Sequence, residues 1–329
     1  MPPPKPQTDM VLSGWQGITV ETPPNWNIGA ISGDASGGYV RYDDDEMPRL
    51  EIKWSSDKGF VDLNTVIDKY LKDLQKNRKK KAPKVEVDRD VKLISKRKRK
   101  KGGLKCFHWQ AENEGYGAAW TCRDCSRTVI AQVMAPVGQA PEEARELAGN
   151  VLLSIDDHPT DGWVLWSAYG FSCYAPEDFK VSGQKLMAGL IELEFEKDTE
   201  KIKMARWGMA NVALKKKTLE QWIGGEAAKE LRKHKADREQ TSILGHDGLT
   251  IEGSNIGGLQ LLHRFYLHCT DKPYADRLIA RAWHCEETNR IYYVETYVDR
   301  ANVGLADELV ARIECHPGVH NGARDDEKA

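Results

Sequence analysis

The sequence lacks any run of apolar residues long enough to cross a membrane. A bilayer span needs about 20 consecutive, mostly apolar residues, and no segment of these 329 residues approaches that pattern. The opening segment, residues 1–6, is proline-rich and has no apolar stretch of the signal-peptide kind. We therefore expect a cytoplasmic protein without a membrane span.

Short motifs of several enzyme classes are also missing. There is no Gly-x-x-x-x-Gly-Lys phosphate loop, no His-Glu-x-x-His and no Gly-x-Ser-x-Gly. Two Cys and His pairs are adjacent, His284-Cys285 and Cys315-His316, but adjacent residues of a strand point to opposite faces. Neither pair then suits a thiol activated by a base. The sequence favours a binding protein over an enzyme and leaves a metal-dependent enzyme as an alternative.

The seven cysteines are an odd number in a chain too long to need disulfide cross-links, and their irregular spacing does not suggest a disulfide framework. Reduced thiols or metal ligands are the remaining explanations. Cys106 and His108 share one face of a predicted strand, and Cys122 and Cys125 form a Cys-x2-Cys turn in the next hairpin. These four residues predict a structural zinc site in the first half. The alternative is a set of buried thiols with a hydrogen-bonded histidine and no cofactor.

Positive charge is concentrated in one region although the net charge is only −2. Residues 76–105 contain fifteen Lys or Arg and three acidic residues. Two basic tracts stand out: Lys79, Lys80, Lys81 and Arg97, Lys98, Arg99, Lys100, Lys101. They flank a predicted strand, so we expect both at one end of the first domain, as a basic face for an acidic protein partner or assembly. Nucleic-acid binding through Lys76–Lys101 is an alternative, and a solvated loop is a third.

An internal duplication is the clearest pattern. Trp120, Cys122 and Arg127 recur 163 positions later as Trp283, Cys285 and Arg290, and Gly102-Gly103-Leu104 and His108 recur 155 positions later as Gly257-Gly258-Leu259 and His263. Each half also ends on His-Pro, at His158 and at His316. We interpret the repeated Trp and Cys as core residues on one strand face and each His as favoured near the negative end of a helix. A functional role is the alternative.

Hydrophobic spacing predicts the elements of each half. Alternating segments predict strands, and the apolar residues between Leu63 and Leu74 recur every three or four positions, as on one face of a helix. A closing helix is expected over 141–153, and Leu219–Leu231 predicts the second central helix. Ile52-Lys53-Trp54 is matched with Met204-Ala205-Arg206-Trp207. The predicted domains are a disordered tail (1–10), a first repeat (11–159), a second repeat (160–319) and a frayed end (320–329).

The predicted fold class is α+β, with two tandem related domains, each a mostly antiparallel sheet with a central helix and a closing helix. The aromatic-rich opening and the turns Pro23-Pro24-Asn25-Trp26 and Pro176-Glu177-Asp178-Phe179 resemble the Mog1/PsbP-like fold. Proteins of that fold mostly bind or assist partners. The resemblance therefore implies a binding role by analogy.

Overall fold

The computed structural model describes residues 10–56, 59, 61–76, 84–89, 91–93, 102–136, 138–226, 234–255 and 274–316. The chain divides between Leu165 and Trp166 into two compact units, and each contains a seven-stranded antiparallel sheet. The prediction of a mostly antiparallel sheet in each half is confirmed. The predicted domain boundaries themselves remain predictions.

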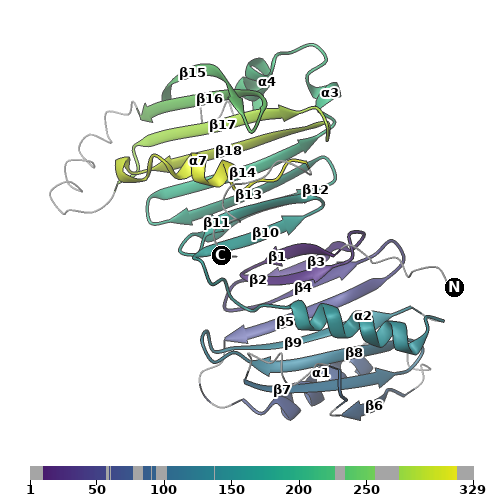
Figure 1. Ribbon diagram of the computed structural model, residues 1–329. Coiled ribbons are helices and arrows are strands. Elements are labelled where there is room, and N and C mark those ends of the chain that lie inside the picture. Colours follow the sequence, from purple (N-terminus) through teal and green to yellow (C-terminus); the bar gives the residue numbers. More distant parts are fainter. Residues whose placement is uncertain are drawn as a thin grey trace, which may run out of the picture. The chain divides into compact units, whose positions relative to one another are not determined.

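The described residues of the first repeat form one hairpin, one sheet and two helices (Figure 1). Its elements are β1 (Val11–Trp15), β2 (Ile18–Thr22), β3 (Asn27–Gly33), β4 (Gly37–Asp43), β5 (Pro48–Ser56), α1 (Leu63–Lys76), β6 (Glu86–Arg89), β7 (Gly102–Gln110), β8 (Glu114–Thr121), β9 (Arg127–Ala135) and α2 (Pro141–Ser154). The sheet order is β3-β4-β5-β9-β8-β7-β6, and β1 pairs with β2.

The second repeat has the same order of strands (Figure 1). Its elements are β10 (Trp163–Ala168), β11 (Phe171–Pro176), β12 (Lys180–Met187), β13 (Leu190–Lys197), β14 (Glu200–Gly208), α3 (Ala210–Ala213), α4 (Leu219–Glu226), β15 (His234–Ile243), β16 (His246–Asn255), β17 (Arg277–Cys285), β18 (Arg290–Val298), a 3-10 turn (Arg300–Asn302) and α7 (Leu305–Val310). The sheet order β12-β13-β14-β18-β17-β16-β15 matches the first sheet strand for strand.

The opening hairpins are built alike. Gln16 and Gly17 join β1 to β2, and Tyr169 and Gly170 join β10 to β11, all four with positive φ of 54°, 80°, 48° and 70°. Two consecutive residues in this conformation make the tight turn whose twist matches paired strands. Both repeats therefore start from one local design.

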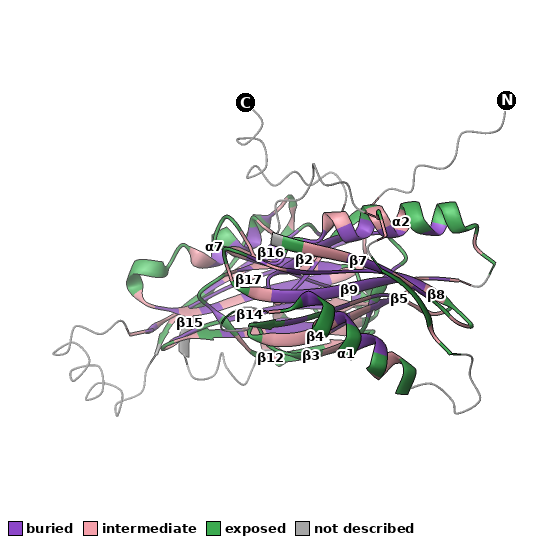
Figure 2. Cartoon of the chain, turned by 90° about the horizontal axis from the view of Figure 1, so that it is seen from below, coloured by how far each residue is buried: buried purple, intermediate pink, exposed green. Residues whose placement is uncertain are grey.

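Helices α1 and α2 lie on opposite faces of the first sheet (Figure 2). The apolar stripe of α1 buries Leu63, Ile67, Tyr70 and Leu71 against β7, β8 and β9, where Phe107, Trp109, Ala119 and Ile130 meet it. The Asp62 carboxylate accepts hydrogen bonds from Asn64 N and Thr65 Oγ1 at the start of α1, which lowers the pKa of Asp62. Spacing and cap together explain why this segment is helical.

Two matches within the duplication differ from the sequence prediction. Strand order makes β16 the counterpart of β7, so the shift of 155 positions does not follow the sheets; residues 257–259 and 263 lie outside the described residues. In the first sheet, Val129 pairs with both Trp120 and Trp54. In the second sheet, Tyr292 pairs with both Trp283 and Arg206. The counterpart of Trp54 is therefore Arg206. A match displaced by one residue moves a side chain to the other face of a sheet.

Candidate functional site: two matching cysteine and histidine clusters

The repeated residues converge at the same place in each repeat. In the first repeat, Cys122, Cys125, Asp157 and His158 place their ligand atoms within 4.8 Å of one another; we call them the first cluster. In the second repeat, His246, Cys285, Cys315 and His316 do the same and form the second cluster. Both clusters combine the end of β8 or β17 with the segment that follows the closing helix.

The chain turn after β8 positions the thiols of the first cluster. Cys122 N donates to Arg127 O at 2.8 Å, and Ser126 has a positive φ of 58°, which confirms the predicted turn. The segment after α2 returns to this turn because Asp156 and Thr19 of β2 exchange backbone hydrogen bonds of 2.9 and 3.0 Å. Asp157 and His158 are thereby held beside the Cys-x2-Cys turn.

Asp157 is the centre of the first cluster. Trp120 Nε1 donates to its Oδ2 at 2.6 Å, and His158 Nδ1 lies 2.7 Å from its Oδ1. His158 Nδ1 also lies 3.5 Å from Cys122 Sγ, and Cys125 Sγ lies 3.9 Å from Asp157 Oδ1. Burial raises the pKa of the Cys122 thiol to about 11. Both Asp157 oxygens are thus engaged by protein groups.

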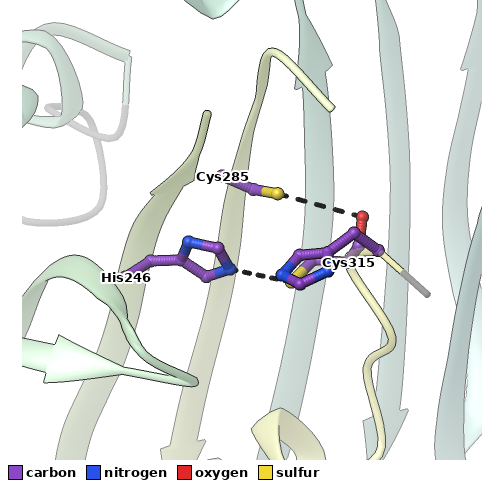
Figure 3. A group of neighbouring side chains, drawn as sticks. His246, Cys285 and Cys315 are labelled. Atoms are coloured by element: carbon purple, nitrogen blue, oxygen red, sulfur yellow. Dashed lines mark hydrogen bonds between the residues drawn. The ribbon is translucent and has the colours of Figure 1, made fainter. Parts of the chain in front are cut away.

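The second cluster has a cysteine where the first has the aspartate. Cys315 Sγ lies 3.3 Å from His246 Nε2, and Cys285 Sγ lies 4.0 Å from Cys315 O (Figure 3). Burial raises the pKa of the Cys315 thiol to about 11. The rings of His246 and His316 meet edge to face with centroids 5.2 Å apart. Two thiols and two imidazoles therefore face one point.

The structure divides the four residues for which zinc was predicted. Cys122 and Cys125 lie together in the first cluster, whereas Cys106 and His108 belong to the middle of β7. His108 pairs with Tyr116 in the sheet register, six residues before Cys122, or roughly 20 Å at the rise of a strand. The His108 ring contacts Glu114 at 3.1 Å and Asp88 at 3.4 Å. The structure places Asp157 and His158, rather than Cys106 and His108, beside the two cysteines.

The basic tracts cannot be assessed directly, because Lys79, Lys80, Lys81 and Arg97 through Lys101 lie outside the described residues. The residues after each tract are described. Glu86 pairs with Gln110, the last residue of β7, and Gly102, which follows the second tract, is the first residue of β7. The described residues that follow the tracts, Glu86 after the first and Gly102 after the second, lie at opposite ends of β7, and the predicted basic face remains a prediction.

Each sheet also carries a group of polar and charged side chains on its first strands, which the described helices leave largely open. In the first repeat we call Tyr39, Arg41, Glu51 and Lys53 the first open face. The Glu51 carboxylate accepts hydrogen bonds from Tyr39, Tyr70 and Gln132 at 2.7 to 2.9 Å. Lys53 lies over the rings of Tyr39 and Tyr70. This face is fixed by side-chain contacts.

The second open face, Lys185, Glu192, Glu194 and Lys203, lies on β12, β13 and β14. Glu192 is 6% exposed and lies 2.6 Å from Lys185 Nζ and 2.7 Å from Lys203 Nζ. Burial alone would raise the pKa of Glu192, but the two lysines hold it below its ordinary value. Both open faces are therefore preorganised and of mixed charge.

His284 lies on the face of β17 opposite to Cys285, as predicted for adjacent strand residues. It lines a cleft of about 390 Å³ together with residues that include Lys217, Glu220 and Asp247.

Among the described residues, no helix is long and apolar enough to cross a membrane.

No family model matches the chain, and no curated protein matches it. A chain of the Tle4–Tli4 complex is similar with a TM-score of 0.33 and 10% identity, over 88% of this chain and 87% of that chain. Immunity protein TplEi of the T6SS from Pseudomonas aeruginosa gives a TM-score of 0.35 and 12% identity, over 93% and 96%. Its complex with an "L" peptide gives 0.32 and 12%, over 94% and 99%.

TM-scores this low do not establish a shared fold. We therefore infer neither partner nor site from these three structures. The Mog1/PsbP-like resemblance also remains a prediction, since no family model matches.

Proposed function

We propose that this chain is a non-enzymatic binding protein whose first repeat contacts an acidic protein partner. The observation that carries the proposal is the first open face and its border. Helix α1 packs along that face through Tyr70, exposes Lys69, Lys72 and Lys76 and leads directly into the first basic tract. A polar face fixed by side-chain contacts and bordered by positive charge suits a macromolecule better than a small ligand.

The charge pattern favours an acidic surface as the partner. Lys53, held over two tyrosine rings, gives the face itself an exposed cation, and the tracts add eight positive residues nearby in sequence. Electrostatic complementarity of this kind mainly accelerates association and selects the partner. The Mog1/PsbP-like resemblance points to the same class of function by analogy alone.

Nucleic acid is the second candidate, because the basic tracts of Lys76–Lys101 would also neutralise phosphates. We place the protein in the cytoplasm as part of the proposal. The six described cysteines are free thiols, which supports a reducing compartment. Subcellular fractionation of the native protein tests this location.

The experiment is affinity capture with the full chain and two matched triple variants. Lys79→Gln, Lys80→Gln and Lys81→Gln remove three charges from the first tract, and Lys215→Gln, Lys216→Gln and Lys217→Gln remove three exposed charges from the second repeat. We expect one protein to be retained by the wild type and the second variant and lost with the first variant. Cross-linking from a photoreactive residue at position 53 should reach the same protein.

Two outcomes would contradict the proposal. Equal retention by both variants would show that the first tract does not bind the partner. Loss of the captured material after nuclease treatment, with a steep decrease in retention as salt is raised, would identify nucleic acid instead.

A further inference from the structure

The second cluster brings together three separate parts of the second repeat. His246 is the first residue of β16, Cys285 is the last residue of β17, and Cys315 and His316 follow α7. We propose that these four side chains bind one Zn²⁺ ion and that the ion fastens the segment after α7 to the end of the sheet. The site is independent of the proposed partner-binding face.

The ligand types and their spacing fit this ion. Two thiolates and two imidazoles are a common structural zinc set, and their ligand atoms lie about 3.5 Å apart when the bonds to a tetrahedral ion are 2.0 to 2.3 Å. Cys315 Sγ and His246 Nε2 are already 3.3 Å apart, and all four ligand atoms lie within 4.8 Å of one another. Only small side-chain movements are needed to reach bonding distance.

The surrounding groups orient the ligands as in a metal site. His246 Nε2 faces Cys315 Sγ, while its Nδ1 lies 3.7 Å from Glu287 Oε2, an oxygen that also lies 3.4 Å from Cys285 Sγ. A carboxylate behind a ligating histidine fixes the ring and its tautomer. Tyr292 donates a hydrogen bond of 3.2 Å to Cys315 O and so holds the backbone of that ligand.

A buried indole supplies a second, independent indication. Trp283 is completely buried, and its Nε1 has no hydrogen-bond partner among the described residues. Its counterpart Trp120 donates to Asp157, the residue at the position of Cys315. A metal-bound thiolate would be a better acceptor for the Trp283 N–H than a neutral thiol.

The composition of the site selects the kind of ion. Thiolate and imidazole favour zinc over magnesium or calcium, which prefer oxygen ligands. Two thiolates balance the charge of a divalent ion, so the buried complex is neutral. Four protein ligands fill a tetrahedral ion and leave no position for a substrate, so the site is structural rather than catalytic.

Cobalt binding to the full chain tests the site. The Cys122→Ser/Cys125→Ser variant removes both thiols of the first cluster and leaves the second intact. After chelation under reducing conditions, we expect this variant to bind about one Co²⁺ per chain, with the d–d bands of tetrahedral cobalt and a thiolate charge-transfer band. Zn²⁺ should displace the cobalt. The wild-type chain is titrated alongside it.

Further variants identify the ligands. Adding Cys285→Ser and Cys315→Ser should abolish both sets of bands, whereas Cys106→Ser, which lies outside both clusters, should leave them unchanged. If the chain with Cys285→Ser and Cys315→Ser does not fold, His246→Gln is the second test. It keeps every thiol of the second cluster and should weaken cobalt binding more than tenfold. The proposal would be overturned if neither the Cys122→Ser/Cys125→Ser chain nor the wild type shows a thiolate band. It would also be overturned if the band persists without Cys285 and Cys315.

Discussion

The two clusters occupy the same position in two copies of one fold, yet they satisfy their buried polar groups in different ways. In the first, the indole of Trp120 and the ring of His158 engage both oxygens of Asp157. In the second, Cys315 takes the place of the aspartate and Trp283 has no hydrogen-bond partner among the described residues. In the first cluster a protein carboxylate accepts from the indole. In the second, the proposed Zn²⁺ would make Cys315 a thiolate able to accept from the Trp283 N–H.

The largest expected difference concerns the two tryptophans. Trp120→Phe leaves a buried Asp157 oxygen without its donor and should lower the free energy of unfolding by about 2 to 3 kcal/mol beyond the loss of packing. Trp283→Phe removes the same ring atoms but no completed hydrogen bond. Urea unfolding of the metal-free chain, followed by circular dichroism, measures both. Equal losses would contradict the difference between the clusters.

The carboxylate behind His246 sharpens the comparison. Glu287→Gln should weaken zinc binding by about tenfold, because the carboxylate charge 3.7 Å from His246 Nδ1 is lost. Glu286→Gln, at the neighbouring exposed position, is the matched control and should have no effect. Competition with a chromophoric chelator gives the affinities. An unchanged affinity for Glu287→Gln would mean that Glu287 does not support the ligand.

The hairpin turns provide a test in which the repeats should behave alike. Gly17→Ala and Gly170→Ala each place a side chain at positive φ and should cost about 1 kcal/mol of stability. The added carbon would lie 3.3 Å from the Arg127 guanidinium in one turn and 3.4 Å from that of Arg290 in the other. Gly162→Ala, at φ 79° with open space around it, measures the backbone effect alone. Thermal unfolding compares the three, and a loss confined to one repeat would show that the turns are not equivalent.

The smallest expected effect is the pH dependence of stability that Glu192 gives to the second open face. The pKa of Glu192 is lowered in the folded protein, so its contribution to stability is present above its ordinary pKa of 4.5 and is lost as pH falls through the lower folded value. Glu192→Gln should reduce stability at pH 7 by about 1 kcal/mol or less. It should also weaken the acid dependence below pH 4.5. Urea unfolding between pH 7 and pH 3 tests this, and an unchanged acid limb would exclude the two lysine contacts as its cause.

Much of the architecture could be predicted from the sequence, because strand alternation, the helical spacing from Leu63 to Leu74 and the repeated Trp-x-Cys are local signals. The match of Trp54 with Trp207 failed because residue identity gives no information on register. Hydrogen-bonded pairing across three strands decided that Arg206 is the counterpart. A displacement of one residue is a small change in a sequence match, but it moves every side chain of the strand to the other face of the sheet.

The clusters were within reach of the sequence but were not assembled from it. Both His-Pro endings were visible, and so were Cys122 and Cys285. What no local pattern provides is the return of the segment after α2 to β2 through Asp156 and Thr19, which brings His158 to the cysteines. His246 is harder still, because its counterpart strand begins with a different residue. Non-local pairing, rather than motif spacing, makes these sites.

The first sheet has Trp54 where the second has Arg206, and this difference bears on which strands can pair during folding. Neighbouring copies of one sheet can trade equivalent strands and become trapped in mixed assemblies. The Trp54 indole donates to Asp34 O, and the Arg206 guanidinium donates to Tyr169 O, so each strand carries a donor suited to its own surroundings. Strand β14 inserted into the first sheet would bury a guanidinium where an indole belongs. The difference at this position would therefore disfavour an exchange of β5 and β14 between the two sheets.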